Sequence, residues 1–173
     1  GYWRVGNTDN PGTPVGQTPL RAPSVFNFYR PGYVAPGTQS GTRNLAAPEL
    51  QLASETTAAG FVNYMRDNVS SGVGANNGTV NGVVRNRRDV QPDFTAELAL
   101  ATDVPGLVSR VADRLSYGNL GAAAQTDIAT AVSSITIPAA TGSNQAAIDT
   151  AKRNRVNAAV LLVLASPEFQ VQK

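Results

Sequence analysis

The sequence predicts a mainly α-helical fold of about five helices, which form a bundle-like core preceded by a long irregular N-terminal segment. Two observations support this prediction. From residue 54 onward, apolar residues recur at three- and four-residue steps, as they do on one face of an α-helix. Before residue 50, helix-breaking residues dominate, because seven of the eleven prolines and seven of the sixteen glycines lie in residues 1–48. We therefore divide the chain into an extended segment at 1–53 and a helical part at 54–173.

Aromatic residues within the first segment argue against a disordered linker. Residues 24–33 read SVFNFYRPGY and hold four aromatic side chains, whereas disordered segments are poor in them. We call residues 24–33 the aromatic strap. We predict that it is extended, with Phe26 and Phe28 buried on the same side.

Charged residues around the strap suggest how it is anchored. Arg30 is expected to form a buried ion pair with Glu49 or Glu55, at the start of the first helix. Tyr29 or Tyr33 beside such a pair could instead line a ligand cleft. The residues that we expect to act as structural anchors are Phe26, Phe28, Arg30, Tyr33, Glu55 and Glu168.

The first expected helix begins after Ser54, which is a good N-cap residue. Its apolar face consists of Phe61, Val62, Met65 and Val69. Residues 70–88 then hold four glycines and two Asn-Gly dipeptides, which suit type I′ turns. Because the flanking runs are short and polar, we predict a mobile surface loop here rather than a hairpin.

Four more helices are expected beyond this loop. Asp93 and Asp103 are the expected N-caps of the next two, and Gly118 ends the second of them. A helix over 121–135 follows, and Asn144 caps the last helix, which runs to about Ala165. The inward face of this last helix is predicted to consist of Ile148, Ala151, Val156, Ala159, Val160 and Val163. Its end, residues 156–165, is apolar nearly all round and must be covered on every side.

Composition excludes several classes of function. Without cysteine or histidine, this chain alone cannot form a disulfide framework, a typical zinc site or a Ser-His-Asp triad. A net charge of +2 favours neither nucleic acid nor an anionic membrane as partner. The longest strongly apolar run, residues 158–165, is far shorter than the roughly 20 residues of a membrane span. We expect no cofactor, metal or catalytic residue in this chain.

Two charged clusters are nevertheless candidates for chemistry. Arg85, Arg87 and Arg88 form a possible anion-binding patch, since guanidinium groups suit carboxylate and phosphate; the alternative is a solvated loop edge, partly paired through Asp89. Asp89, Asp93 and Glu97 are spaced four residues apart. Paired carboxylates of this kind can act in acid–base catalysis or bind Ca²⁺. We favour capping for Asp93.

Several motifs together resemble one bacterial family. They are the aromatic strap, Ala47-Pro48-Glu49-Leu50-Gln51 with Glu55, Pro92-Asp93-Phe94 with Glu97-Leu98-Ala99-Leu100, Arg155-Val156-Asn157-Ala158-Ala159-Val160, and Ser166-Pro167-Glu168-Phe169. This order is similar to the C-terminal part of the family known as domain of unknown function 1800 (DUF 1800).

The resemblance implies that the chain is the C-terminal segment of a larger all-α domain and that the protein is exported. It supplies no catalytic residues. The first residue is Gly1 and the one methionine is Met65, so we expect a matured product or a fragment. The expected partner is the upstream part of the same polypeptide, packed on the strap and the last helix; an exported or cell-surface partner protein is a further candidate.

Three functions are open at this point. The first is a structural or interaction portion that completes a larger helical fold. The second is part of a secreted hydrolase that acts on extracellular polymer, with its catalytic residues upstream. The third is a carbohydrate-binding surface, whose aromatic residues would be Tyr2, Trp3, Tyr29 and Tyr33.

Overall fold

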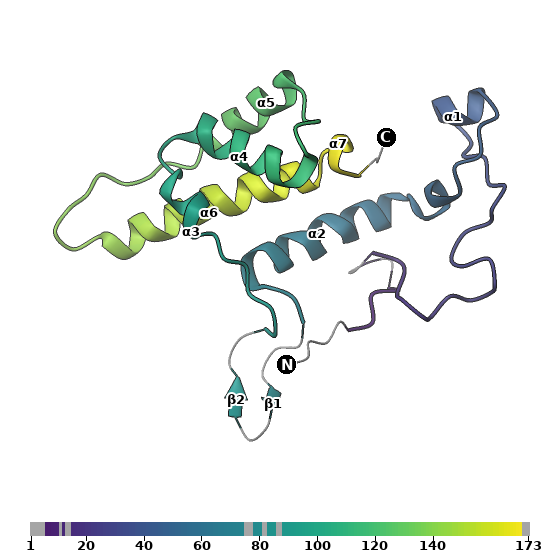
Figure 1. Ribbon diagram of the computed structural model, residues 1–173, viewed down its shortest axis with the longest axis horizontal. Helices are drawn as coiled ribbons and strands as arrows, with labels where there is room; N and C mark the ends of the chain where they lie inside the picture. Colours follow the sequence, from purple (N-terminus) through teal and green to yellow (C-terminus); the bar gives the residue numbers. More distant parts are fainter. Residues whose placement is uncertain are drawn as a thin grey trace. The chain divides into compact units, whose positions relative to one another are not determined.

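The computed structural model describes residues 6–10, 12, 15–74, 78–80, 83–85 and 88–170 (Figure 1). The chain divides into two compact units, one of residues 1–68 and 73–90 and the other of residues 69–72 and 91–173. The elements are mainly helical, which confirms the predicted fold class. No helix in the described ranges combines the length and the apolar character that a membrane crossing requires.

The second unit is a helical bundle. Its elements are α3 (Thr95–Ala99), α4 (Val104–Ser116), α5 (Ala122–Ser133), α6 (Gln145–Leu164) and α7 (Pro167–Gln170). Helices α4, α5 and α6 pack against one another, and the short helices α3 and α7 contact both α4 and α6 (Figure 1). The predicted helices over 93–100, 103–117, 121–135 and 144–165 correspond to α3 to α6.

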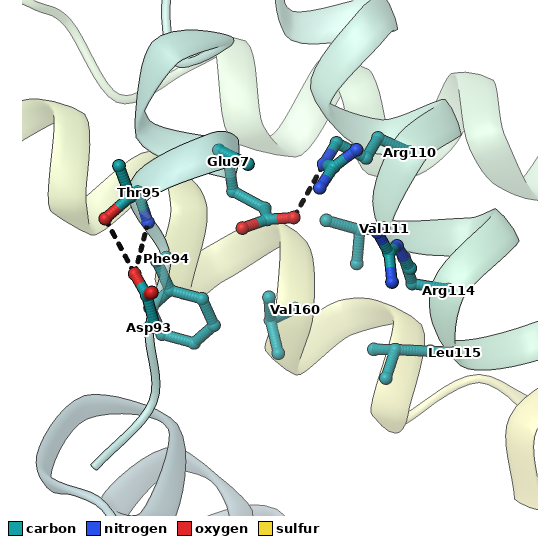
Figure 2. A pocket seen from close by; sticks show the side chains of 10 residues that line it. Asp93, Phe94, Thr95, Glu97, Arg110, Val111, Arg114, Leu115 and Val160 are labelled. Atoms are coloured by element: carbon teal, nitrogen blue, oxygen red, sulfur yellow. Dashed lines mark hydrogen bonds and ion pairs between the residues drawn. The ribbon is translucent and has the colours of Figure 1, made fainter.

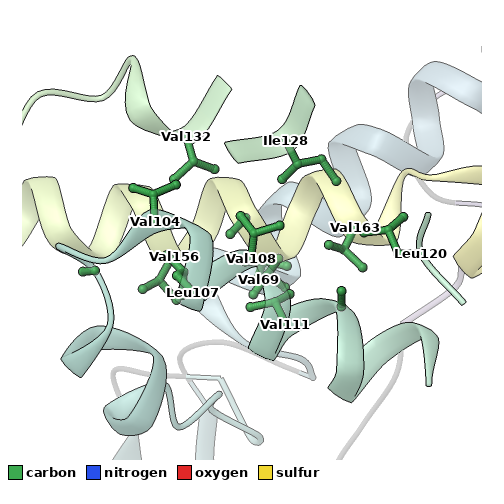
Figure 3. Packing of buried hydrophobic residues seen from close by; sticks show 14 residues of the cluster. Val69, Val104, Leu107, Val108, Val111, Leu120, Ile128, Val132, Val156 and Val163 are labelled. Atoms are coloured by element: carbon green, nitrogen blue, oxygen red, sulfur yellow. The ribbon is translucent and has the colours of Figure 1, made fainter. Parts of the chain in front are cut away.

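The core of this unit lies between α4, α5 and α6. Leu107 and Val108 of α4, Val132 of α5, and Val156 and Val163 of α6 are almost completely buried (Figure 3). The six residues predicted to face inward on α6 are its six buried residues, because a 3.6-residue period identifies the buried face before any neighbour is known. Every residue over 156–165 is buried or half-buried. The neighbours in the bundle therefore cover much of the end of α6.

The predicted caps agree with the structure to different degrees. The Asp103 carboxylate accepts a hydrogen bond from the Gly106 amide at 3.2 Å, which confirms it as the N-cap of α4. Asn144 holds the N-cap position of α6, but its side chain bonds backward to Thr141 and Ala139 and stabilises the preceding loop. At the end of α4, the left-handed C-cap is Tyr117, and Gly118 after it also has a positive φ.

The first unit has less regular structure. It contains α1 (Gln39–Thr42), the 3-10 helix η1 (Pro48–Leu52), most of α2 (Glu55–Ser71), and the strands β1 (Gly78–Val80) and β2 (Val83–Arg85). Ser54 caps α2 as predicted. Its hydroxyl accepts from the Thr57 amide at 3.2 Å, and the Thr57 hydroxyl accepts from the Ser54 amide at 2.8 Å, which is the reciprocal pattern of a capping box.

The segment expected to be a loop contains a hairpin. Strands β1 and β2 are antiparallel, with Gly78 opposite Arg85. Val73 and Val90 exchange two main-chain hydrogen bonds at 2.9 Å as an isolated antiparallel pair, two residues after α2 ends at Ser71. This contact joins residues far apart in the sequence, so the local composition does not reveal it. That residues 70–88 are mobile stays a prediction.

The aromatic strap is not extended over its first residues. The Asn27 amide donates to the Ser24 carbonyl at 3.1 Å, and Asn27 has a φ of +64°. These residues form a turn, since asparagine adopts the left-handed conformation more readily than most residues. The prediction that Phe26 is buried is wrong, because its exposed fraction is 59%. Phe28 and Tyr33 are half-buried.

Candidate functional site

A cavity of about 490 Å³ lies on the second unit, between α3, α4 and α6 (Figure 2). Its apolar floor combines side chains from all three segments: Phe94, Val111, Leu115 and Val160. Charged and polar side chains form its rim: Asp93, Thr95, Glu97, Arg110 and Arg114. A cavity of this volume, with an apolar floor and a few polar groups, has the form of a small-molecule binding site.

An ion pair between two helices shapes one side of the cavity. Glu97, in the first turn of α3, accepts a hydrogen bond from Nε of Arg110 on α4 at 2.7 Å. The exposed fractions of these side chains are 14% for Glu97 and 33% for Arg110. Because both groups are largely shielded from water, the pair fixes the direction of the Arg110 guanidinium. Arg114 lies one turn further along α4 and lines the same cavity.

Asp93 and Thr95 form the opposite part of the rim (Figure 2). The Asp93 carboxylate accepts from the Thr95 hydroxyl at 2.6 Å and from the Thr95 amide at 3.0 Å. These bonds, the hydroxyl first, lower the pKa of Asp93, because they favour the charged form. We predicted Asp93 as the N-cap residue of α3, but the N-cap residue is Phe94, one position later. The Asp93 carboxylate nevertheless accepts a hydrogen bond from the first helical amide, that of Thr95.

The three acidic residues spaced four apart have different surroundings. Asp93 and Glu97 line the same cavity, but Asp93 is bonded by Thr95 and Glu97 by Arg110. Asp89 belongs to the first unit, where its side chain lies beside Gly74. Within the described ranges, no group of three acidic residues is arranged to hold a metal ion.

The arginine cluster is only partly described. Arg88 pairs with the Asp67 carboxylate and also donates to the Asn68 side chain at 3.2 Å, so α2 holds its guanidinium. Arg85 lies on β2, but its side chain falls outside the described part of the structure, as does the whole of Arg87. Whether the three bind an anion together stays a prediction.

The predicted anchors of the strap make other contacts than expected. Over the described residues Arg30 is exposed and makes no ion pair with Glu49 or Glu55, which are also exposed. Its backbone amide instead donates to the Gln51 side chain at 2.8 Å. A neutral amide thus ties the strap to η1, and the charged groups stay in water, where they need no partner.

The remaining candidates are scattered. Glu168 lies half-buried in the first turn of α7. Tyr29, like Tyr33, is half-buried, whereas Tyr2 and Trp3 fall outside the described residues. The carbohydrate-binding surface that needs these four residues therefore stays a prediction.

The sequence pattern identified only part of the cavity. It singled out Asp93 and Glu97, but not Thr95, Arg110 or Arg114. The available signal was the four-residue spacing of the two arginines, which places both on one helix face. Their proximity to Glu97 depends on how α3 packs against α4, which the spacing does not show.

Comparison with known proteins gives one family. The profile of the family described as protein of unknown function (DUF1800) matches residues 3–171. No curated protein and no solved structure matches the chain.

Proposed function

This chain belongs to the DUF1800 family, and from that premise we propose that it is the C-terminal structural and interaction portion of an exported bacterial protein. In this proposal the chain completes a larger helical fold, and the upstream part of the same polypeptide covers the first unit. Export rests on the family resemblance. Fractionation of native cells, with the intact mass and N-terminal sequence of the recovered protein, tests it.

The observation that supports this function is how few apolar residues are buried among the described residues of the first unit. Ala35 is the only buried apolar residue among those described in this unit. In the second unit, by contrast, more than a dozen apolar residues form one buried cluster. Few buried apolar residues mean little free energy gained from burial, so the described part of this unit would be stabilised by a further surface to pack against.

Large apolar side chains are exposed in the first unit. Among the described residues they are Leu20, Val25, Phe26, Leu45, Leu50, Val62 and Val90. In the second unit, the described residues include one such side chain, Tyr117. Single exposed apolar residues are ordinary on a protein surface, but their concentration in one unit marks it as a packing surface.

The turn of the strap offers the most direct contact point. Val25, with an exposed fraction of 96%, and Phe26 lie at its centre. Covering each side chain fully would contribute about 1.5–3 kcal/mol. Because a segment of the same polypeptide is present at high effective concentration, even a modest contact of this kind would be occupied.

Hydrogen exchange with and without the upstream polypeptide tests this proposal. We expect the amides of residues 24–35 to exchange rapidly in the chain of residues 1–173 alone and slowly in the longer native protein. The replacement Phe26→Ser should restore rapid exchange in the longer protein. Tyr117→Ser, which alters an exposed aromatic residue of the second unit, is the control and should not. Equal exchange of residues 24–35 in the short and long proteins would contradict the proposal.

A further inference from the structure

We propose that the cavity between α3, α4 and α6 binds a small monocarboxylate with an apolar body, such as an aryl or short acyl acid. In this binding mode the apolar body lies on the floor of the cavity, and the carboxylate bonds the arginines of α4. The inference is independent of how the first unit is covered, because every residue that lines the cavity belongs to the second unit.

The floor determines the apolar part of the ligand. Phe94 contributes an aromatic ring, and Val111, Leu115 and Val160 contribute aliphatic side chains (Figure 2). Phe94 and Leu115 are partly buried against the core, so the packing of the bundle fixes their positions. A ligand body placed there removes apolar surface from water on both sides, which is the main driving force for binding in such sites.

The two arginines determine the charged part. Arg110 uses Nε for Glu97, and this bond leaves its two terminal nitrogens as donors for a further acceptor. Arg114 makes no ion pair within the described ranges and lines the same cavity. Two guanidinium groups one helical turn apart present several N–H donors in a geometry that suits a carboxylate.

The opposite rim limits the ligand to one negative charge. The Asp93 carboxylate lies there, held by the hydroxyl and amide of Thr95. A second carboxylate on the ligand would approach Asp93 and be repelled by it. On the arginine side of the cavity, two guanidinium groups stand against the single carboxylate of Glu97, and this local excess of positive charge suits one anionic group.

The test is a titration of the chain of residues 1–173 with 3-phenylpropionate and hexanoate, followed by amide NMR shifts. We expect saturable binding of at least one of them up to about 10 mM, with shifts in α3 and α4. The neutral amide 3-phenylpropanamide and the dicarboxylate phenylsuccinate should bind at least about tenfold more weakly. Absence of saturable binding by both acids would overturn the proposal, as would equal binding of the acid and its amide.

Variants separate the roles of the charges. Arg114→Gln should weaken binding of 3-phenylpropionate about tenfold, because it removes a charged donor, and the exposed position favours a small effect on stability. Lys152→Gln removes a cation from α6 outside the cavity and is the matched control. Glu97→Gln should strengthen binding severalfold, since it removes the anion that competes for Arg110. If Arg114→Gln and Lys152→Gln had the same effect, the carboxylate would not be bound at this cavity.

Discussion

Arg155 shows how one side chain connects several elements of the second unit. It lies on α6, and its guanidinium donates from Nε to the Ile135 carbonyl at 2.8 Å and from a terminal nitrogen to the Ala101 carbonyl at 3.0 Å. Ile135 follows α5 and Ala101 follows α3. The cation therefore satisfies carbonyl groups just beyond the ends of two helices, where the helix dipole also favours positive charge.

We predict that Arg155→Met lowers the free energy of unfolding by about 2 kcal/mol, because two hydrogen bonds from a charged donor are lost. Urea denaturation followed by circular dichroism measures this loss. The control is Lys152→Met on the same helix, which makes no such hydrogen bond among the described residues and should cost under about 0.5 kcal/mol. Equal losses for the two variants would contradict a clamping role for Arg155.

Asp93 gives a prediction on pH. Hydrogen bonds from Thr95 lower its pKa in the folded chain below the ordinary value of about 3.9. An acid whose pKa is depressed on folding contributes stability above its unfolded pKa. That contribution is lost as the pH falls through the folded pKa. Asp93 therefore contributes to acid denaturation below about pH 4 and has no effect on stability changes near neutrality.

Thr95→Val removes the hydroxyl that bonds Asp93 most strongly, so we expect the pKa of Asp93 to rise toward its ordinary value. Titration of the side-chain carboxyl carbon by NMR measures it. Thr126→Val is the control, because the Thr126 hydroxyl bonds the Ala122 carbonyl instead of a carboxylate. An Asp93 pKa that is the same in the native chain and in Thr95→Val would show that the hydroxyl is not the cause.

At the scale of elements, the start of α4 shows why a glycine can be required inside a helix. A side-chain carbon placed at Gly106 would lie 2.3 Å from a carboxylate oxygen of Asp103, the N-cap residue. A larger residue would therefore push the cap aside. The helical pattern alone predicts that alanine would be better here, because glycine costs up to about 1 kcal/mol in a helix.

We predict that the effect of Gly106→Ala depends on Asp103. In the native chain the gain in helix propensity is offset by loss of the cap, which is worth about 1 kcal/mol, so stability should change little. In an Asp103→Ala background no cap remains to be lost, and the same change should stabilise the chain by up to about 1 kcal/mol. Thermal unfolding of the four proteins measures the coupling. Additive effects would mean that the two side chains do not compete for space.

At the scale of the whole molecule, apolar burial is concentrated in the second unit. Leu107 has an exposed fraction of 0%, whereas Phe26 in the first unit has 59%. For the chain of residues 1–173 alone, we predict that Leu107→Ala costs about 2–5 kcal/mol, as for a buried leucine. Phe26→Ala should cost less than about 1 kcal/mol.

Denaturant unfolding of both variants measures these losses. A loss for Phe26→Ala that approaches the loss for Leu107→Ala would show that the strap is packed within this chain. The exposed surface on which the proposed function rests would then not exist.

The sequence by itself determined helices α2 to α6, because their signals are local, but it did not indicate the short helices α1 and η1. Ser54 and Asp103 cap helices through bonds to amides three residues away, and the apolar period on α6 identified all of its buried residues. The four-residue spacing also identified Asp93 and Glu97 as candidate residues for acid–base catalysis or Ca²⁺ binding. These properties depend on spacing along one helix, which the order of residues fixes.

Only the tertiary structure decided which residues from different elements lie together. The pairing of Glu97 with Arg110, the two carbonyls at Arg155 and the Val73–Val90 pair each join distant parts of the chain. The prediction that Phe26 is buried failed for a related reason. An aromatic cluster indicates a preference for burial, but burial requires a surface to pack on, and a turn at Asn27 leaves Phe26 without one in this chain.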